Sequence, residues 1–459
     1  MAGIGVRLDE LALTGGLSGR MSVYVTGAVL TSGQWLLAII GIGVLGVIAN
    51  LVTEREVVTD FRLVIVYVFA TAGILTGTFS MATVRQISNE LYLERPEEIP
   101  GIVFGLLCTV SLASVPIGIA LFAGLAQIDG RMLPAAVIAL VALSQLWVLA
   151  LVTTALAEVR TVILSYLAGT IVSVALAYQA ARTGQASEMV LGYTAGVVLT
   201  VVLQISVFFR AFPFSAPPIA DCLRTIREGV ADYLPLALGG LFAAAAIWAD
   251  NIVLWYSRFG VTAPVGLRYA PNFDAAKFYG LLCLVPGFTA IVFFEARIFV
   301  GLRRHLARIM AHATLAEIDL QEGSLRERIV HSLRRLVLTQ AAVALLVILL
   351  APGLASAGLL AHRSVPIMQM TAIGTVFHIL LAVCGMVLLY LDAQRGFCAV
   401  QLAFLVCVLA ASLMPLVLGP RYLGVAYPLG AAFAGSFALR ITLSTLDRLN
   451  ERLFTPRRT

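Results

Sequence analysis

Long apolar stretches recur along the chain from Met21 to Arg440, and only short polar breaks separate them. Twelve stretches reach the length of about 20 residues that a helix needs to cross a bilayer. This pattern predicts an all-α polytopic membrane protein and leaves no room for a large soluble domain. The predicted spans cover residues 22–51, 61–81, 101–125, 133–156, 161–181, 188–212, 230–257, 277–300, 336–361, 365–391, 397–419 and 422–442.

The composition also favours a membrane location. Of the 459 residues, 60% are hydrophobic and 12% charged, and the mean hydropathy is +0.97. Soluble domains average about 25% charged residues. The six cysteines form no metal-type or CxxC spacing, so we expect buried free thiols.

A proline-rich break divides the predicted spans into two groups of six. The halves share three residue types at offsets of 212 to 214 positions, which favours a parallel duplication of the kind found in transporters. The matched pairs are Trp35 with Trp248, Asp60 with Asp274, and Arg85 with Arg297. The predicted domains are an N-terminal six-helix lobe (1–212, with an interfacial segment 1–21), a cytoplasmic linker (213–229), a C-terminal six-helix lobe (230–443, with a cytoplasmic amphipathic segment 301–335) and a cytoplasmic tail (444–459).

The distribution of basic residues predicts the orientation. With the N-terminus inside, 22 of the 31 basic residues fall in inner segments, as the positive-inside rule requires. Both termini are therefore expected in the cytoplasm, and the formal charge of +6 calls for no nucleic-acid partner. The basic cluster at 303–335 has two interpretations, a helix facing lipid headgroups or a docking surface for a cytoplasmic partner.

Asp250 stands out because it lies inside an apolar run, 230–256. A carboxylate in a spanning helix costs roughly 2.5–3.5 kcal/mol, so such a helix usually faces protein or a water-filled cavity. Asp250 follows Asp232 by about 27 Å of helix, near the outer end of the span. Lys277, the only lysine in the chain, is predicted to enter the next span from the same side. The two residues predict either a static ion pair or a functional site, which is an outer gate or a proton-coupled site.

A second charged group is predicted at the inner side. Arg85 and Glu295 could pair across the lobes as an inner gate, and the alternative is snorkelling towards the headgroups. We expect His378 to be a hydrogen-bonded core residue rather than a proton relay. The remaining cavity or gate candidates are Glu90, Arg297, Gln34 and Asn251, and the aromatic cavity candidates are Trp248 and Tyr279.

Motifs for catalysis are missing. The chain has no GxxxxGK[ST], no HExxH and no GxSxG, so we expect no enzyme, no cofactor and no metal site. A primary pump would need a separate ATPase.

Several stretches, spread in order over the whole chain, resemble the PelG family, which belongs with the MOP-type exporters. They are MAGIGVRLDELALTGGLSGRMSVYVTGAVLTSGQWLL, VRQISNELYLERPEEIPG, WADNIVLWYS, the region from YAPNFDAAKFYG to AHATLAEID, and LYLDAQRG with RLNERLFT. The family often has proline at the position of Gln34 and a basic residue at that of Asn251.

The resemblance implies a MATE-like fold with a cavity between two lobes, lined by the first, second, seventh and eighth helices. It also implies export of an amino-sugar exopolysaccharide rich in N-acetylhexosamine, as used in biofilms. The implied partners are a cytoplasmic glycosyltransferase and inner-membrane subunits, one of which senses cyclic-di-GMP. We therefore expect a bacterial inner-membrane polysaccharide exporter or flippase, surrounded by lipid. The alternatives are a cation-coupled drug or metabolite extruder of the same fold and a non-transporting anchor for a polysaccharide synthase. The energy source stays open between polymer extension and proton coupling.

Overall fold

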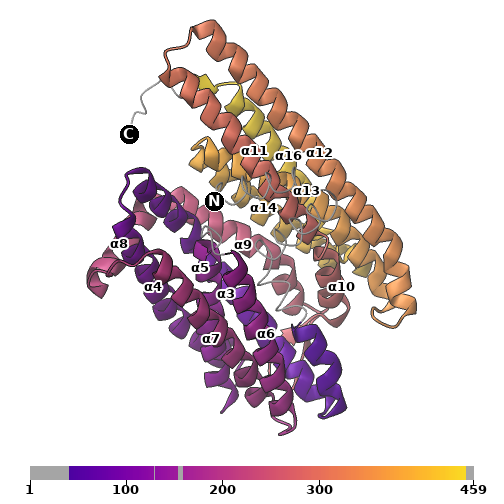
Figure 1. Cartoon of the computed structure of the whole chain (residues 1–459). Helices are drawn as coiled ribbons and strands as arrows, with labels where there is room; N and C mark the ends of the chain where they lie inside the picture. The colour runs from indigo at the N-terminus through magenta and orange to yellow at the C-terminus, as the bar shows by residue number, and fades with distance from the viewer. Residues whose placement is uncertain (1–40, 129, 154–158, 451–459) are drawn as a thin grey trace. The chain divides into compact units, whose positions relative to one another are not determined.

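The structure is a computed structural model that describes residues 41–128, 130–153 and 159–450 (Figure 1). Eleven of its helices are long and apolar enough to span a membrane, and they correspond to the second to twelfth predicted spans. The apolar helix Gly41–Leu51 is the part of the first predicted span that the structure describes. Gln34, Trp35 and the interfacial segment 1–21 lie outside the described residues.

The helices pack into two compact units that divide after Ala270. We call the described residues 41–270 the N-terminal unit and 271–450 the C-terminal unit. The helices α8 (Ile219–Asp232) and α9 (Leu234–Trp255) pack with α3 (Arg55–Tyr92), which precedes them in the chain. The division into two six-helix lobes at 213–229 stays a prediction.

In the N-terminal unit, α3 packs against α4, α5, α7, α8 and α9. The helix α7 packs against α5 and α6, and α5 packs against α3 and α4 (Figure 1). The remaining elements of the unit are η1 (Ala49–Leu51), η2 (Pro96–Glu98), α4 (Ile99–Ile119), the π-helix η3 (Ala120–Leu125), α5 (Met132–Thr153), α6 (Val159–Ala181), α7 (Ala186–Ala211), β1 (Val261–Thr262) and β2 (Arg268–Tyr269).

A glycine pair lets α3 and α9 cross closely. A Cβ atom added to Gly240 would meet the carbonyl oxygen of Gly77 at 2.1 Å, and one added to Gly77 would meet that of Gly240 at 2.9 Å. Only residues without a side chain fit this crossing. It holds α9, which carries Asp250, against the middle of α3.

The short hairpin β1–β2 is fixed to α3 by two hydrogen bonds. The backbone N–H of Val265 donates to Asp60 Oδ1 (3.3 Å), and the hydroxyl of Tyr67 donates to the carbonyl oxygen of Arg268 (2.6 Å). The turn needs Gly266, whose φ is +88°, because an L side chain rarely adopts that conformation. The hairpin therefore ties the end of α9 to α3.

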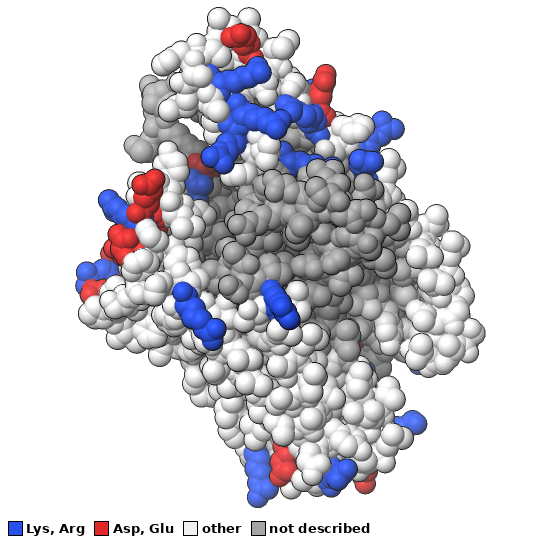
Figure 2. Space-filling view, viewed as in Figure 1, with Lys and Arg blue, Asp and Glu red and all other residues white. Residues whose placement is uncertain are grey.

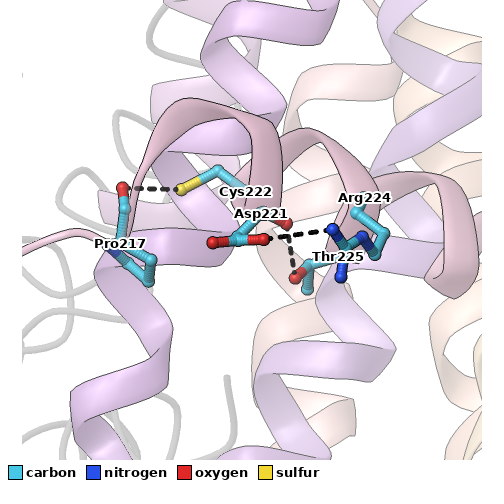
Figure 3. Close-up of polar contacts among 5 residues, drawn as sticks. All are labelled: Pro217, Asp221, Cys222, Arg224 and Thr225. Carbon is cyan, nitrogen blue, oxygen red and sulfur yellow. Dashed lines mark hydrogen bonds and ion pairs between the residues drawn. The ribbon is translucent and has the colours of Figure 1, made fainter.

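The helix α8 follows the proline-rich break and lies against α4 and α3. Its first turn is fixed by Cys222 Sγ, which donates to the carbonyl oxygen of Pro217 (3.4 Å), and by an ion pair between Arg224 and Asp221 (3.3 Å) (Figure 3). Gly105 of α4 lies so close that an added Cβ would meet the carbonyl oxygen of Cys222 at 2.5 Å. The predicted linker is thus a packed amphipathic helix.

In the C-terminal unit, α13 lies at the centre and packs against α10, α12 and α16, while α11 packs against α12 (Figure 1). The elements are α10 (Pro271–Leu281), α11 (Leu284–Met310), α12 (Leu315–Ser356), η4 (His362–Ser364), α13 (Val365–Tyr390), α14 (Gln394–Ser412), α15 (Met414–Leu418), η5 (Pro420–Tyr422) and α16 (Ala426–Leu446).

The span predicted over 277–300 falls within one candidate membrane span, Pro271–Met310, and the structure adds a break in it between α10 and α11. Proline has no N–H and its ring clashes with the carbonyl four residues earlier. Pro286 therefore fits only in the first turn of a new helix, and the chain makes tighter turns at Leu282 and Cys283. Gln340 of α12 caps the break, since its Nε2 donates to the carbonyl oxygen of Cys283 (2.9 Å) and to Thr375 Oγ1 (3.0 Å).

Residue 335, where the predicted amphipathic segment ends, lies inside a helix. The structure has one continuous helix, α12, of 42 residues, which joins the predicted amphipathic segment to the ninth span. No proline or glycine lies between Ser324 and Ala351, so nothing in the backbone interrupts it. The segment 301–335 is therefore a helical hairpin made by the end of α11 and the start of α12.

Candidate functional site

Asp250 is almost completely buried in the last third of α9, with 1% of its surface exposed. Its Oδ1 accepts a hydrogen bond from the backbone N–H of Asn251 (2.9 Å), and Asn251 is itself buried. A buried carboxylate in a spanning helix is able to bind a proton, a cation or an amine. Asp250 and Asn251 are thus both buried, and their role at a cavity or gate stays a prediction.

An aromatic group surrounds this end of α9. The rings of Tyr67 and Trp255 stack with their centroids 4.5 Å apart, and the half-buried Trp248 lies 6.4 Å from Trp255. Arg268 places its Cζ 5.8 Å from the ring of Tyr256. Tyr67 and Trp255 lie far apart in the sequence, and local periodicity gave no signal that could have paired them.

Lys277 is buried in α10 of the C-terminal unit, with 2% of its surface exposed. Its Nζ lies 5.9 Å from the ring centroid of Phe273 and 5.8 Å from that of Tyr427 on α16. Such cation–π contacts are worth up to about 2 kcal/mol each when water is excluded. Tyr279, the other aromatic candidate on α10, is half-buried and packs edge-on against Phe278.

His378 lies in the same aromatic surroundings. Its ring stacks on Tyr427 at 5.8 Å and meets Phe404 and Phe288 edge-on. Its Nδ1 is buried and has no hydrogen-bond partner among the described residues. His378 therefore lies in the core, and the choice between a hydrogen-bonded core residue and a proton relay stays a prediction.

Glu295 on α11 has a partner within its own unit. The hydroxyl of Tyr390, the last residue of α13, donates to Glu295 Oε1 at 2.6 Å. Arg297, two residues further on, is exposed. Sequence reasoning missed Tyr390, because a hydroxyl 95 positions away leaves no local pattern.

Arg85 and Glu90 lie on α3 of the N-terminal unit, and both are half-buried. Around them, α3 is held to the linker region. Gln86 Nε2 donates to the carbonyl oxygen of Thr225 (3.0 Å), and Asn89 Nδ2 to the hydroxyl of Tyr233 (2.5 Å). This end of α3 is therefore a polar contact region for α8 and for the start of α9.

The predicted gate pairs join residues of different units. Asp250 and Arg85 belong to the N-terminal unit, whereas Lys277 and Glu295 belong to the C-terminal unit. Both pairings stay predictions.

Two hollows are found within the units, and neither contains a predicted site residue. A small cavity of about 20 Å³ lies between α3, α5, α6 and α7, next to Tyr166, Ser173 and Tyr193, and has room for about one water molecule. A surface hollow of about 280 Å³ is lined by Ala220, Leu223, Arg224 and Arg227 of α8. Among the described residues, no group of three or more His, Cys, Asp and Glu side chains could hold a metal ion. Cys222, Cys283 and Cys384 are buried, the other three cysteines are half-buried, and all six thiols are free.

Known structures show the class of fold. A crystal structure of a MATE transporter in the bent conformation matches with a TM-score of 0.59 and 14% identity over 98% of this chain and 99% of that one. A MOP superfamily transporter from Pyrococcus furiosus Vc1 matches with a TM-score of 0.62 and 14% identity over 93% and 96%. An outward-facing multidrug resistance MATE family transporter matches with a TM-score of 0.61 and 14% identity, also over 93% and 96%. The chain therefore has the fold of MOP-superfamily transporters.

The family follows from the sequence match. Residues 1–454 match the model of the PelG family, described as "Putative exopolysaccharide Exporter (EPS-E)". The chain belongs to the PelG family, and it is a membrane transporter. No curated protein sequence matches it.

Proposed function

We propose that this protein exports an N-acetylhexosamine-rich exopolysaccharide across the bacterial inner membrane, with both termini in the cytoplasm. The family match over residues 1–454 carries the proposal. The excess of arginine in the predicted inner segments supports the orientation. The proposed partners are a cytoplasmic glycosyltransferase and inner-membrane subunits of the same export system.

Asp250 and Lys277 are the proposed outer gate. Their burial supports this role, because charges at membrane depth are costly and usually serve a pathway or a pair. Arg85 and Glu295 are the proposed inner gate, with Glu90, Gln34 and Arg297 close to them in the sequence or on neighbouring predicted helices. Alternating access or passage coupled to polymer extension would use both gates in turn.

The test replaces Asp250 by Asn, which keeps the shape and removes the charge. Secreted polymer is measured with an N-acetylhexosamine-binding lectin, and the amount of protein in the membrane by immunoblot. We expect secretion to fall at least about tenfold with normal membrane levels, because a neutral amide cannot bind a proton or pair with a cation at the gate; a tenfold fall corresponds to about 1.4 kcal/mol in the transport barrier. The matched control is Asp232→Asn, an exposed carboxylate at the end of α8. Equal secretion by both variants would remove Asp250 from the mechanism.

A second candidate function is a cation-coupled extruder of drugs or metabolites, which the fold of the multidrug MATE relatives supports. It predicts that energised cells export a dye and that this efflux stops when the ion gradient collapses. It also predicts that loss of the transporter leaves the amount of secreted polymer unchanged. A third, a non-transporting anchor for a synthase, predicts that Asp250→Asn is harmless.

A further inference from the structure

The hairpin formed by residues 301–335 is longer than a membrane helix needs. At about 1.5 Å per residue the 42 residues of α12 extend over about 63 Å, twice the roughly 30 Å of a bilayer core. The apolar part of α12 starts at Leu336, so Leu315 lies about 30 Å further along the helix axis. The headgroup layer is only several ångströms thick. The tip of the hairpin therefore projects beyond the headgroup region.

The hairpin is a rigid element. Thr314 caps α12 with a complete capping box, in which Glu317 N–H donates to Thr314 Oγ1 (3.4 Å) and Thr314 N–H to Glu317 Oε2 (2.9 Å). His312 closes the turn with a φ of +57°. Ile318, Leu325 and Ile329 are buried between the two helices and their neighbours.

The segment that follows α16 also stiffens the hairpin and binds one of its acidic side chains, Asp319. Arg326 pairs with Asp447 (2.7 Å), and Asn450 bridges the hairpin by donating to Asp319 Oδ1 (3.0 Å) and lying 3.2 Å from His305 Nε2. Glu317 is bound in the capping box. Two of the four acidic side chains between residues 303 and 335, Glu317 and Asp319, thus have partners within the chain.

The outward surface is basic with an apolar tip. Between residues 303 and 335 there are seven arginines and four acidic residues, and all seven arginines are exposed. Figure 2 shows basic side chains gathered over the end of the C-terminal unit where α11 and α12 meet. Met310, Leu315 and Leu320 are 80%, 68% and 76% exposed. Large apolar side chains that are this exposed at the tip of one hairpin favour a contact with a partner.

We propose that this hairpin is the docking surface for a cytoplasmic protein that presents an apolar recess with an acidic rim. The distance of the tip from the bilayer disfavours lipid as the cover, and the arginines supply the complementary charge. The proposal rests on the proposed cytoplasmic orientation and goes beyond the export function, since it names how the transporter joins its partner. The rigid form means that little ordering entropy is lost on docking.

The first test places a photo-crosslinking amino acid at position 320 of the full chain in its native host. The control position is 359, which is 61% exposed and lies beyond the other end of α12. We expect irradiation to join position 320, and not position 359, to one cytoplasmic protein, which mass spectrometry identifies. Adducts with lipid alone, or with no protein, overturn the proposal.

The second test measures binding of that purified protein to the full chain in nanodiscs. The double variant Arg303→Glu/Arg304→Glu should weaken binding at least about tenfold, and raising salt from about 50 to about 300 mM should weaken the wild type. Leu320→Ser should weaken binding without changing the salt dependence. The charge-matched control is Arg363→Glu/Arg421→Glu, two exposed arginines predicted on the opposite side of the membrane.

An equal loss of binding affinity in the two double variants would refute the docking surface. Thermal unfolding of each variant in detergent verifies that it is folded. Because binding is measured without transport, a failure of these tests leaves the export proposal standing. Unchanged secretion by Asp250→Asn, which would count against the proposed gate, leaves the docking surface standing.

Discussion

The crossing of α3 and α9 gives the sharpest physical prediction of the structure. Replacing Gly240 by Ala puts a Cβ atom 2.1 Å from the carbonyl oxygen of Gly77. Ordinary contacts of this kind are above about 3 Å, so the two helices must separate by about 1 Å, which forfeits a quarter to a half of the dispersion energy of the affected atom pairs. Overpacking of this kind costs about 1–3 kcal/mol, and alanine regains about 1 kcal/mol of helix propensity.

The net expectation for Gly240→Ala is a loss of up to about 2 kcal/mol of unfolding free energy. Gly77→Ala should lose less, since its nearest contact is 2.9 Å. Gly43→Ala should leave the unfolding free energy unchanged or raise it, because an added Cβ atom at Gly43 meets nothing within 4 Å. The assay is thermal unfolding of the detergent-solubilised chain followed by size-exclusion fluorescence. Equal melting temperatures for the Gly240 and Gly43 variants would refute the close crossing, and with it the placement of Asp250 beside α3.

Three further variants test single contacts. Gln340→Leu should cost about 1–3 kcal/mol, because it leaves the Cys283 carbonyl at the helix break without its donor. Gln369→Leu, which removes a half-buried bond to the Ile348 carbonyl, should cost less in the same thermal assay. Tyr390→Phe removes the hydroxyl that donates to Glu295. It should reduce the unfolding free energy by about 1–3 kcal/mol, seen as a lower melting temperature. An unchanged melting temperature would show that the hydrogen bond from Tyr390 to Glu295 does not contribute to stability. Thr314→Ala should cost about 1 kcal/mol locally, seen as faster hydrogen exchange over residues 315–320 with an unchanged global melting temperature. Thr339→Ala, on the same helix, should leave that exchange unaltered.

The sequence pattern located the spans well, because each depends only on the local density of apolar residues. It predicted eleven of the observed spanning helices and the burial of Asp250. It missed the break before α11, although Pro286 was a visible signal, because the apolar run continues through it. It also missed the length of α12, since a change from polar to apolar residues does not end a helix.

Contacts between distant segments were beyond sequence reasoning. The stack of Tyr67 on Trp255, the bond from Tyr390 to Glu295 and the capping of the break by Gln340 depend on how helices pack. A hydroxyl or an amide in an apolar helix often bonds back to its own helix, so the residue type alone does not reveal a remote partner. The gate pairs predicted across the two units depend on such remote placement as well.

The central claim is that this chain moves an amino-sugar polymer through the membrane. The direct measurement is efflux of a fluorescent N-acetylhexosamine oligosaccharide trapped in proteoliposomes that contain the purified full chain, followed by lectin capture outside. We expect efflux above that of protein-free vesicles, and a reduced rate for Asp250→Asn but not for Asp232→Asn. Efflux equal to that of protein-free vesicles, with and without an imposed proton gradient, would contradict the claim.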